Sequence, residues 1–167
     1  MKRFSKGEKV IYGAYGVGVV NKVVEKEIQG QKLKFYEIFF EDSNSKIFIP
    51  VERIDRAGVR KLIEPEEIKD VFSKFQSPVE FMDISDWKSR YRENLEKVKS
   101  GNIFQIAEVI RDLSLLNRKK PLSMRERELL EKAKKIFVDE ISEVKNTSPD
   151  EIRKKLDSLL KEERDLV

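Results

Sequence analysis

The pattern of hydrophobic and polar positions changes at Pro65. Before it, short runs rich in Val, Ile, Phe and Tyr are separated by Gly, Asn and Ser, which is typical of β-strands joined by tight turns. The runs are EKVIYG, GVGVVNKVVEKEI, KLKFYEIFFED and SKIFIPVE. Four or five strands in about 60 residues predict a small antiparallel β barrel of the SH3 or Tudor type over residues 1–64.

The second of these runs does not alternate cleanly. One of its faces mixes apolar and basic side chains, namely Val20, Lys22, Val24, Lys26 and Ile28. A strand with one buried face places apolar side chains at every second position. We therefore expect a bend or bulge near Gly16 and Gly18 that turns the strand.

After Pro65 the apolar residues follow helical spacing. A first stripe comprises Ile68, Val71, Phe72 and Phe75. A second stripe follows the loop QSPVEFMDIS and comprises Trp87, Tyr91, Leu95 and Val98. We expect Ser85 to cap this second helix and Gly101 to end it.

Three further helices are predicted toward the C-terminus. One begins at Asn102, and two more open at capping boxes of the form Ser-x-x-Glu, formed by Ser123 with Glu126 and by Ser148 with Glu151. Residues 65–167 are thus expected to form an all-α helical bundle. The predicted fold class is a two-domain α+β protein.

The residue types exclude several classes of enzyme. The 167 residues include no histidine and no cysteine, so there is no imidazole base, thiolate ligand or disulfide. The adjacent carboxylates at 41–42, 66–67 and 162–163 suit turns and solvated helix faces, and GAYGVGV lacks the lysine of a phosphate-binding loop. We expect no enzyme activity, no cofactor and no metal. No apolar run approaches the roughly 18 residues of a membrane span, which favours a cytoplasmic protein.

The net charge of +4 is unevenly distributed. Residues 1–65 carry 13 basic and 9 acidic side chains, whereas residues 66–167 carry 22 of each. This balance does not fit a polycation that coats nucleic acid, so any DNA contact would come from local patches. One such patch is residues 87–99, with five basic and two acidic side chains, and residues 118–127 form a second basic cluster.

Trp87, the only tryptophan, allows two interpretations. As a member of the stripe with Tyr91 it would lie in the core. Alternatively, the neighbouring Lys88, Arg90 and Arg92, together with the helix N-terminus, would attract an anion. An aromatic ring among phosphate-binding groups can wedge into a base step of the DNA minor groove. The spacing alone leaves both interpretations open.

The hairpin FFEDSNSKIFIPVE also has two interpretations. Its apolar residues are Phe39, Phe40, Ile47, Phe48 and Ile49. In so small a barrel, alternate side chains of these strands must face outward. Either the rest of the protein covers both faces, or the hairpin ends in an edge strand to which a strand of a partner adds.

The motifs of both halves resemble the CarD/CdnL-type bacterial transcription regulators, in the same order and over nearly the whole chain. The first half carries FSKGEKVIYGAYGVGVV, IQGQKLKFYEI, IFIPVE and GVRKLI. The second half carries DWKSRYRENLEKVKSGN, IAEVIRDLS and LSMRERELLEKAKKIFVDEIS. The first half alone is also similar to the polymerase-binding domain of transcription-repair coupling factor, whose helicase motor this sequence lacks.

The resemblance implies two binding partners. A Tudor-like domain would bind the β1 lobe of the RNA polymerase β subunit by strand addition. A helical domain would meet promoter DNA at the upstream edge of the −10 element, where the family's tryptophan wedges into the minor groove and stabilises the open bubble. The implied DNA-binding residues are Trp87, Lys88, Arg90, Arg92 and Arg127. The implied polymerase-binding residues are Lys26, Lys46, Ile47, Phe48, Ile49 and Pro50.

Two positions depart from the family's pattern. Ser89 stands two positions after the tryptophan, where members can carry a basic residue, which leaves the choice of phosphate contacts open. Phe48 stands where some members have arginine on the polymerase-facing strand. A phenylalanine there implies a more apolar interface or a partner surface that differs correspondingly.

The predicted function is a non-enzymatic regulator of transcription initiation that stabilises the promoter open complex and reaches the nucleoid through RNA polymerase. Two alternatives remain. A stand-alone nucleic-acid-binding module would bind DNA or RNA without polymerase, with an affinity that falls steeply with salt. A protein–protein adaptor would bury Trp87 and make no DNA contact. The sequence leaves open whether the effect is activation or repression, which promoters respond, and the oligomeric state.

Overall fold

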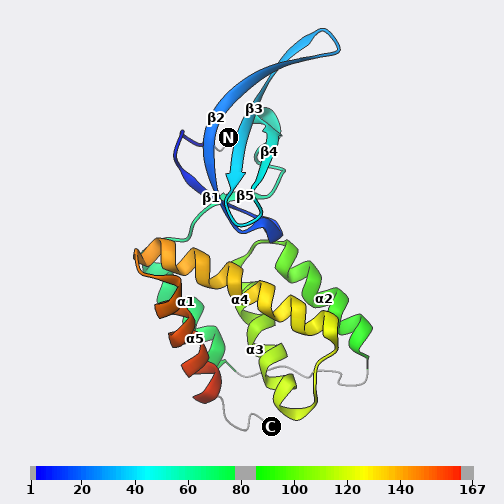
Figure 1. Cartoon of the computed structure of the whole chain (residues 1–167), viewed down its shortest axis with the longest axis vertical. Coiled ribbons are helices and arrows are strands. Elements are labelled where there is room, and N and C mark those ends of the chain that lie inside the picture. The colour runs from blue at the N-terminus through cyan, green and yellow to red at the C-terminus, as the bar shows by residue number, and fades with distance from the viewer. Residues whose placement is uncertain (1–2, 78–85, 163–167) are drawn as a thin grey trace. The chain divides into compact units, whose positions relative to one another are not determined.

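The computed structural model describes residues 3–77 and 86–162. The chain divides into two compact units, Met1–Leu62 and Ile63–Val167. The first is built from strands and the second from helices (Figure 1). This confirms the predicted fold class of a small antiparallel β unit followed by a helical bundle, with the described strands paired as an open sheet where a barrel was expected.

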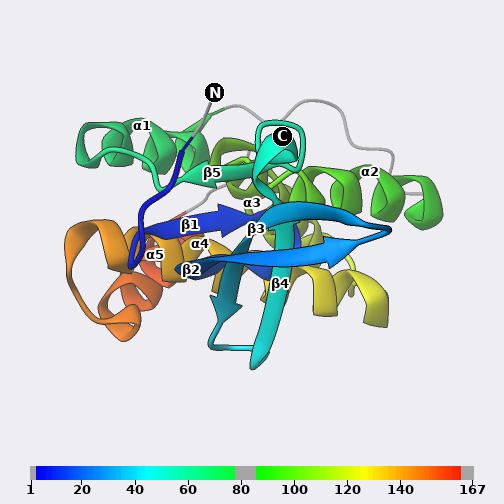
Figure 2. The same ribbon diagram turned by 90° about the horizontal axis from the view of Figure 1, so that it is seen from above.

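The first unit is a single antiparallel sheet in the order β4-β3-β2-β1-β5. Its strands are β1 (Lys9–Tyr12), β2 (Val17–Ile28), β3 (Gln31–Phe40), β4 (Ser45–Pro50) and β5 (Val59–Lys61). Among the described residues β4 and β5 have one strand neighbour each, so the pairing is that of an open sheet and does not close a ring. Figure 2 shows the strand direction turning strongly between β1 and β4, as expected of a small twisted sheet.

Strand β2 carries the expected change of register, but in a different place. The pairing with β3 shifts between Val20 and Lys22, so Asn21 is the additional residue. The prediction of a bulge near Gly16 and Gly18 was therefore wrong in position. A polar side chain at the bulge is satisfied locally, because Asn21 Nδ2 donates a hydrogen bond of 3.2 Å to Glu37 Oε2 on β3.

Gly18 serves a different purpose. A Cβ atom at this position would lie 2.6 Å from Cε1 of Phe40 and 2.9 Å from Cγ2 of Ile38, both distances below normal van der Waals contact. Glycine therefore lets β2 approach the aromatic core closely. The core consists of buried residues Phe4, Val10, Val20, Tyr36, Ile38, Phe40, Ile49, Ile54 and Val59.

Strands β2 and β3 continue beyond the rest of the sheet. Strand β4 pairs only with residues 35–40 of β3, so residues 25–28 and 31–34 form a two-stranded arm. The arm is visible as the long hairpin in Figure 1. It turns through Gln29 and Gly30, both with positive φ (52° and 75°), as a tight type I′ hairpin requires.

The described residues of the second unit form five α-helices. They are α1 (Ile68–Ser73), α2 (Trp87–Lys99), α3 (Ile103–Lys119), α4 (Met124–Lys145) and α5 (Pro149–Glu162). Short 3₁₀ turns, η3 (Pro65–Glu67) and η4 (Lys74–Gln76), flank α1. The core lies around α3 and α4, where Phe137 meets the rings of Phe72 and Phe75 edge-on at centroid distances of 5.5 Å.

Most of the predicted helix boundaries are confirmed. Ser123 and Glu126 form a reciprocal capping box at the start of α4, and Gly101, with φ of 73°, follows the end of α2. Ser85, the predicted cap of α2, lies outside the described residues. Asp86 holds the cap position instead, and its Oδ1 accepts a hydrogen bond of 3.1 Å from the backbone N–H of Ser89.

None of the helices in the described ranges is long and apolar enough to cross a membrane.

Candidate functional site

Trp87 lies at the surface of the helical unit. It is the first residue of α2, and 37% of its surface is exposed. It does not belong to the core cluster of the described residues, and Tyr91 and Leu95 only pack against that cluster from its edge. Of the two interpretations of Trp87, the structure thus supports an exposed ring over a core residue.

The buried face of α2 differs from the predicted stripe. The buried residues of α2 are Asn94 and Val98, and the side chain of Arg90, one helical turn before Asn94, is only 12% exposed. The inward face is therefore rotated from the apolar stripe toward polar residues. Counting apolar side chains missed this face because two of its three members are polar.

Arg90 forms a buried ion pair with Glu126 at the start of α4. Its Nε and Nη2 donate hydrogen bonds to the two carboxylate oxygens of Glu126 at 2.6 and 3.0 Å, a bidentate arrangement. Glu126 is fully buried, and Ser123 Oγ also donates to it at 3.0 Å. The pair ties the first turn of α2, and with it Trp87, to the first turn of α4.

The environment of Glu126 lowers its pKa. Burial raises the pKa of this carboxyl, but hydrogen bonds from Arg90 and Ser123 and the positive charge of Arg90 outweigh burial, so the pKa falls below its ordinary value. The carboxylate therefore stays ionised, and the ion pair stays formed, to lower pH than an exposed glutamate would allow.

This shift predicts a pH-dependent stability of the helical unit. Because the folded-state pKa of Glu126 lies below the unfolded value of about 4.3, its contribution is fully present above that value and is lost as pH falls through the lower, folded pKa. We expect Glu126→Gln to reduce the slope of unfolding free energy against pH in the acid range. Denaturant unfolding followed by helical circular dichroism between neutral and acid pH measures this slope.

The matching control for this titration is Glu128→Gln. Glu128 lies on the same helix but is exposed. A slope that changes equally in both variants would contradict the assignment to Glu126.

The other predicted DNA-binding residues lie at the surface. Lys88, Arg92 and Arg127 are exposed, and none forms an ion pair with another described residue. Arg127 directly follows Glu126, so the ion pair brings this cation and the start of α2 to the same part of the bundle. Arg90 differs from these three because its Nε and Nη2 already donate to Glu126.

Lys120 is a cation near Trp87 that the sequence assigned only to a general basic cluster. Both side chains line one pocket, because the connection between α3 and α4 passes beside the first turn of α2. Another member of that cluster, the exposed Arg118, donates to the backbone carbonyl of Leu160 on α5. The structure thus separates the cluster into a residue beside Trp87 and a residue that joins helices.

The second candidate surface is the edge strand β4. Its side chains alternate, with Lys46 and Phe48 exposed, Ile49 buried and Ile47 packed against the sheet core. Of the predicted polymerase-binding residues, Ile47 and Ile49 therefore face the core. A partner strand added to β4 would meet mainly Lys46, Phe48 and the half-buried Pro50.

Phe48 is joined by a basic residue of β2. The Nζ atom of Lys26 lies 3.6 Å from the centroid of the Phe48 ring and 5.9 Å from that of Phe35. This cation–π contact brings two predicted polymerase-binding residues together although they lie on different strands. The outer face of the sheet thus presents an apolar ring with a fixed positive charge over it.

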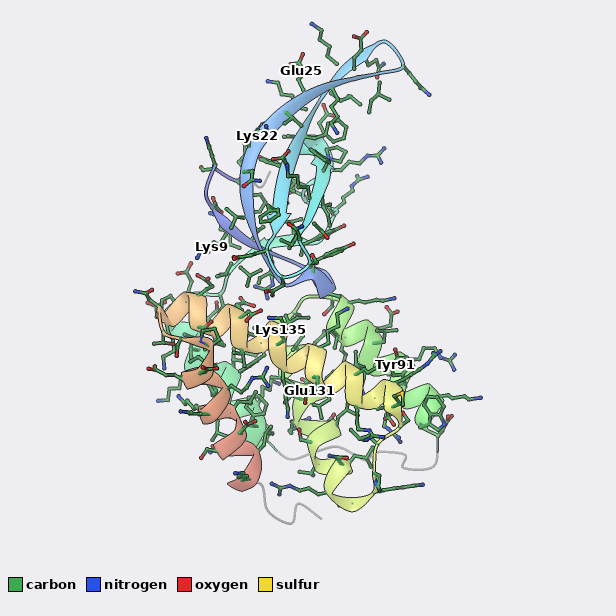
Figure 3. The ribbon with its side chains drawn as sticks, viewed as in Figure 1. Lys9, Lys22, Glu25, Tyr91, Glu131 and Lys135 are labelled. Atoms are coloured by element: carbon green, nitrogen blue, oxygen red, sulfur yellow. The ribbon has the colours of Figure 1, made fainter. Side chains whose placement is uncertain are left out.

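The remaining charged surface shows ordinary helix pairing. Glu131 and Lys135, labelled in Figure 3, lie on the exposed side of α4, and Lys135 pairs with Asp139 at 3.1 Å. Across the described ranges, no group of three or more Asp or Glu side chains is placed to hold a metal ion.

Two family models match the chain. The one described as "CarD, C-terminal domain" matches residues 70–157, and the one described as "CarD-like/TRCF RID domain" matches residues 4–63.

Individual proteins show the same likeness. The chain is 29% identical over 150 residues to "Putative transcription factor YdeB" of Bacillus subtilis (strain 168). The aligned residues cover 90% of this chain and 97% of that protein. It is also 32% identical to the solution NMR structure of the 72-residue N-terminal domain of Myxococcus xanthus CarD, over 35% of this chain and 79% of that one, with a TM-score of 0.31.

Proposed function

The chain belongs to the CarD family of transcription regulators, and from this premise we propose that it stabilises the promoter open complex while bound to RNA polymerase. The sheet unit would bind the β1 lobe of the β subunit through β4. The helical unit would insert Trp87 into the minor groove at the upstream edge of the bubble, near the −10 element, within the cytoplasmic nucleoid.

One observation carries this proposal. The only tryptophan of the chain is exposed at a helix N-terminus, in a part of the bundle that also presents Lys88, Arg92, Lys120 and Arg127. A core residue would not be placed there, and an adaptor surface without DNA would not need so many unpaired cations. Phosphate contacts would position the helix, and the ring would act on the base step.

The role of Arg90 differs in this proposal from that of its neighbours. Its guanidinium is held by Glu126, so Arg90 would position the first turn of α2 instead of binding a phosphate. Lys120 takes its place among the candidate phosphate contacts because it lies beside Trp87. This arrangement also accounts for Ser89, since phosphate binding need not come from the position two residues after the tryptophan.

Two anchors on one complex allow each to be weak. Binding of the sheet unit to polymerase would raise the effective concentration of the helical unit at the DNA. The helical unit then needs only to bind the open state more tightly than the closed state. A preference of about tenfold shifts the closed–open equilibrium tenfold, because a ligand moves an equilibrium by its differential affinity.

The direct test compares the half-life of promoter open complexes with and without the protein. The cognate polymerase forms these complexes on a promoter, and a competitor is then added. A longer half-life with the protein supports the proposal. An unchanged half-life, together with salt-sensitive binding to DNA in the absence of polymerase, would favour a stand-alone nucleic-acid-binding module instead.

The edge strand makes a separate prediction. We expect Phe48→Glu to weaken binding of the protein to the polymerase β1 lobe by roughly tenfold or more, because it places a carboxylate in a desolvated apolar contact. Titration of the isolated β1 lobe by calorimetry measures this affinity.

Ile28→Glu is the matched control for this prediction. Ile28 is also an exposed apolar residue of the sheet, but it pairs with Gln31 at the end of the arm, beyond the residues that pair with β4. Equal losses for the two variants would contradict strand addition at β4.

A further inference from the structure

A pocket of about 240 Å³ opens beside Trp87, where the first turn of α2 meets the connection between α3 and α4. The indole forms part of its wall. Leu116 and Leu122, both almost fully buried, give it an apolar lining. Pro121 and Lys120, both exposed, come from the connection itself. The pocket thus combines an aromatic ring, an apolar surface and a cation.

The charge in the pocket is positive overall. Its remaining lining includes the Arg90–Glu126 ion pair, in which the carboxylate is neutralised by the bidentate guanidinium. Lys120 has no such acidic partner among the described residues. An occupant should therefore offer an apolar planar face to the indole and a negative charge to Lys120.

The size limits what can enter. A volume of about 240 Å³ lies below the roughly 300 Å³ at the lower end of pockets that enclose drug-sized ligands. One small ring system fits such a space. A nucleotide has both required parts, since its base stacks on aromatic side chains and its phosphate pairs with a lysine.

The geometry points to a binding site for one unpaired nucleobase of a DNA strand, with the base against Trp87 and its phosphate on Lys120. This inference rests on the proposed function, because the upstream edge of an open bubble supplies unpaired bases. Bases within a duplex are covered by their neighbours, and extruding one costs a few kcal/mol. The site would accordingly select DNA that has already opened.

Such a site would add to the preference for the open state that the wedge provides. A wedge needs only the ring of Trp87. A base pocket also needs free space beside the ring and the cation of Lys120. Because every base has a planar face, capture by stacking would read little sequence.

The test uses the whole chain and fork-shaped DNA, a duplex with one single-stranded tail, at low salt and without polymerase. Fluorescence anisotropy gives the affinity for the intact fork and for forks with an abasic site at each of the first unpaired positions in turn. We expect the abasic site at one of these positions to weaken binding by about tenfold, because one base–aromatic stack is lost. Fully paired DNA should show no comparable loss when one base is removed.

Variants locate the effect in the pocket. We expect Pro121→Trp, which fills the space, to abolish most of the difference between intact and abasic forks. We expect Lys120→Ala to weaken binding to both forks alike, because an abasic site keeps its phosphate. Lys119→Ala is the matched control for Lys120→Ala, because this adjacent exposed lysine does not line the pocket, and it should weaken binding to both forks less. Thermal unfolding of each variant separates loss of the site from loss of the fold.

The abasic series in wild type decides the inference even if Pro121→Trp fails to fold. Equal affinity for intact and abasic forks at every position would overturn the base-binding site. The minor-groove wedge of Trp87 would still be supported if the protein lengthened the half-life of open complexes. Clear discrimination at one position without any effect on open complexes would support the pocket while contradicting the proposed function.

Discussion

Trp87→Ala is expected to bring the half-life of promoter open complexes back to within about twofold of that seen with polymerase alone, where the wild-type protein lengthens it roughly tenfold or more. The expected loss is large because the ring would contact DNA only in the open state, so its removal takes away differential binding and leaves polymerase binding unchanged. The variant should fold, since Trp87 is exposed and lies outside the core cluster.

Met124→Ala is the matched control for loss of an exposed apolar side chain. Met124 begins α4 and is 70% exposed, more than Trp87. We expect it to change the half-life by less than about twofold, as for a surface side chain without a specific partner. A Trp87→Phe variant should keep part of the effect, because a smaller ring can still enter a base step.

The result of Trp87→Ala separates the three candidate functions. A stand-alone nucleic-acid-binding module would lose affinity for free DNA, with no dependence on polymerase. An adaptor would keep its full effect on open complexes, because its surface would not include the ring. Only a regulator anchored to polymerase would keep binding to the β1 lobe and lose the longer half-life.

The elements of this fold could be predicted from local chemistry. β-Branched and aromatic runs between turn residues marked the strands, and the reciprocal capping box of Ser123 and Glu126 marked the start of α4 correctly. The need for a bulge in β2 was also visible in its mixed face. The position of the bulge at Asn21 could not be predicted, because a bulge depends on how two strands pair and not on the glycines of one strand.

The candidate site was predictable in part. The exposure of Trp87 could be suspected from its basic neighbours, but periodicity placed it on the same face as Tyr91 and Leu95. The actual inward face includes Arg90 and Asn94, and a buried arginine cannot be recognised without its carboxylate partner on another helix. Lys120 could not be singled out among the lysines of its connection, since its place beside Trp87 follows from how α2 packs against α3 and α4.

Removing either partner of the Arg90–Glu126 ion pair is expected to lower the free energy of unfolding of the helical unit by about 3 kcal/mol or more, because the other charge is left buried. Arg90→Met and Glu126→Gln are the single variants, and urea unfolding followed by circular dichroism measures both. Lys135→Ala is the control. It removes an exposed i,i+4 pair with Asp139 and should cost less than about 0.5 kcal/mol.

The double variant Arg90→Met with Glu126→Leu separates stability from function. Replacing both charges by apolar side chains of similar size should recover much of the lost stability, because no unpaired charge remains buried. It should not restore the longer open-complex half-life, because the bidentate contact that orients the first turn of α2 is gone. If the double variant regained both, the ion pair would serve only the fold, and Trp87 would be positioned by the packing of α2 alone.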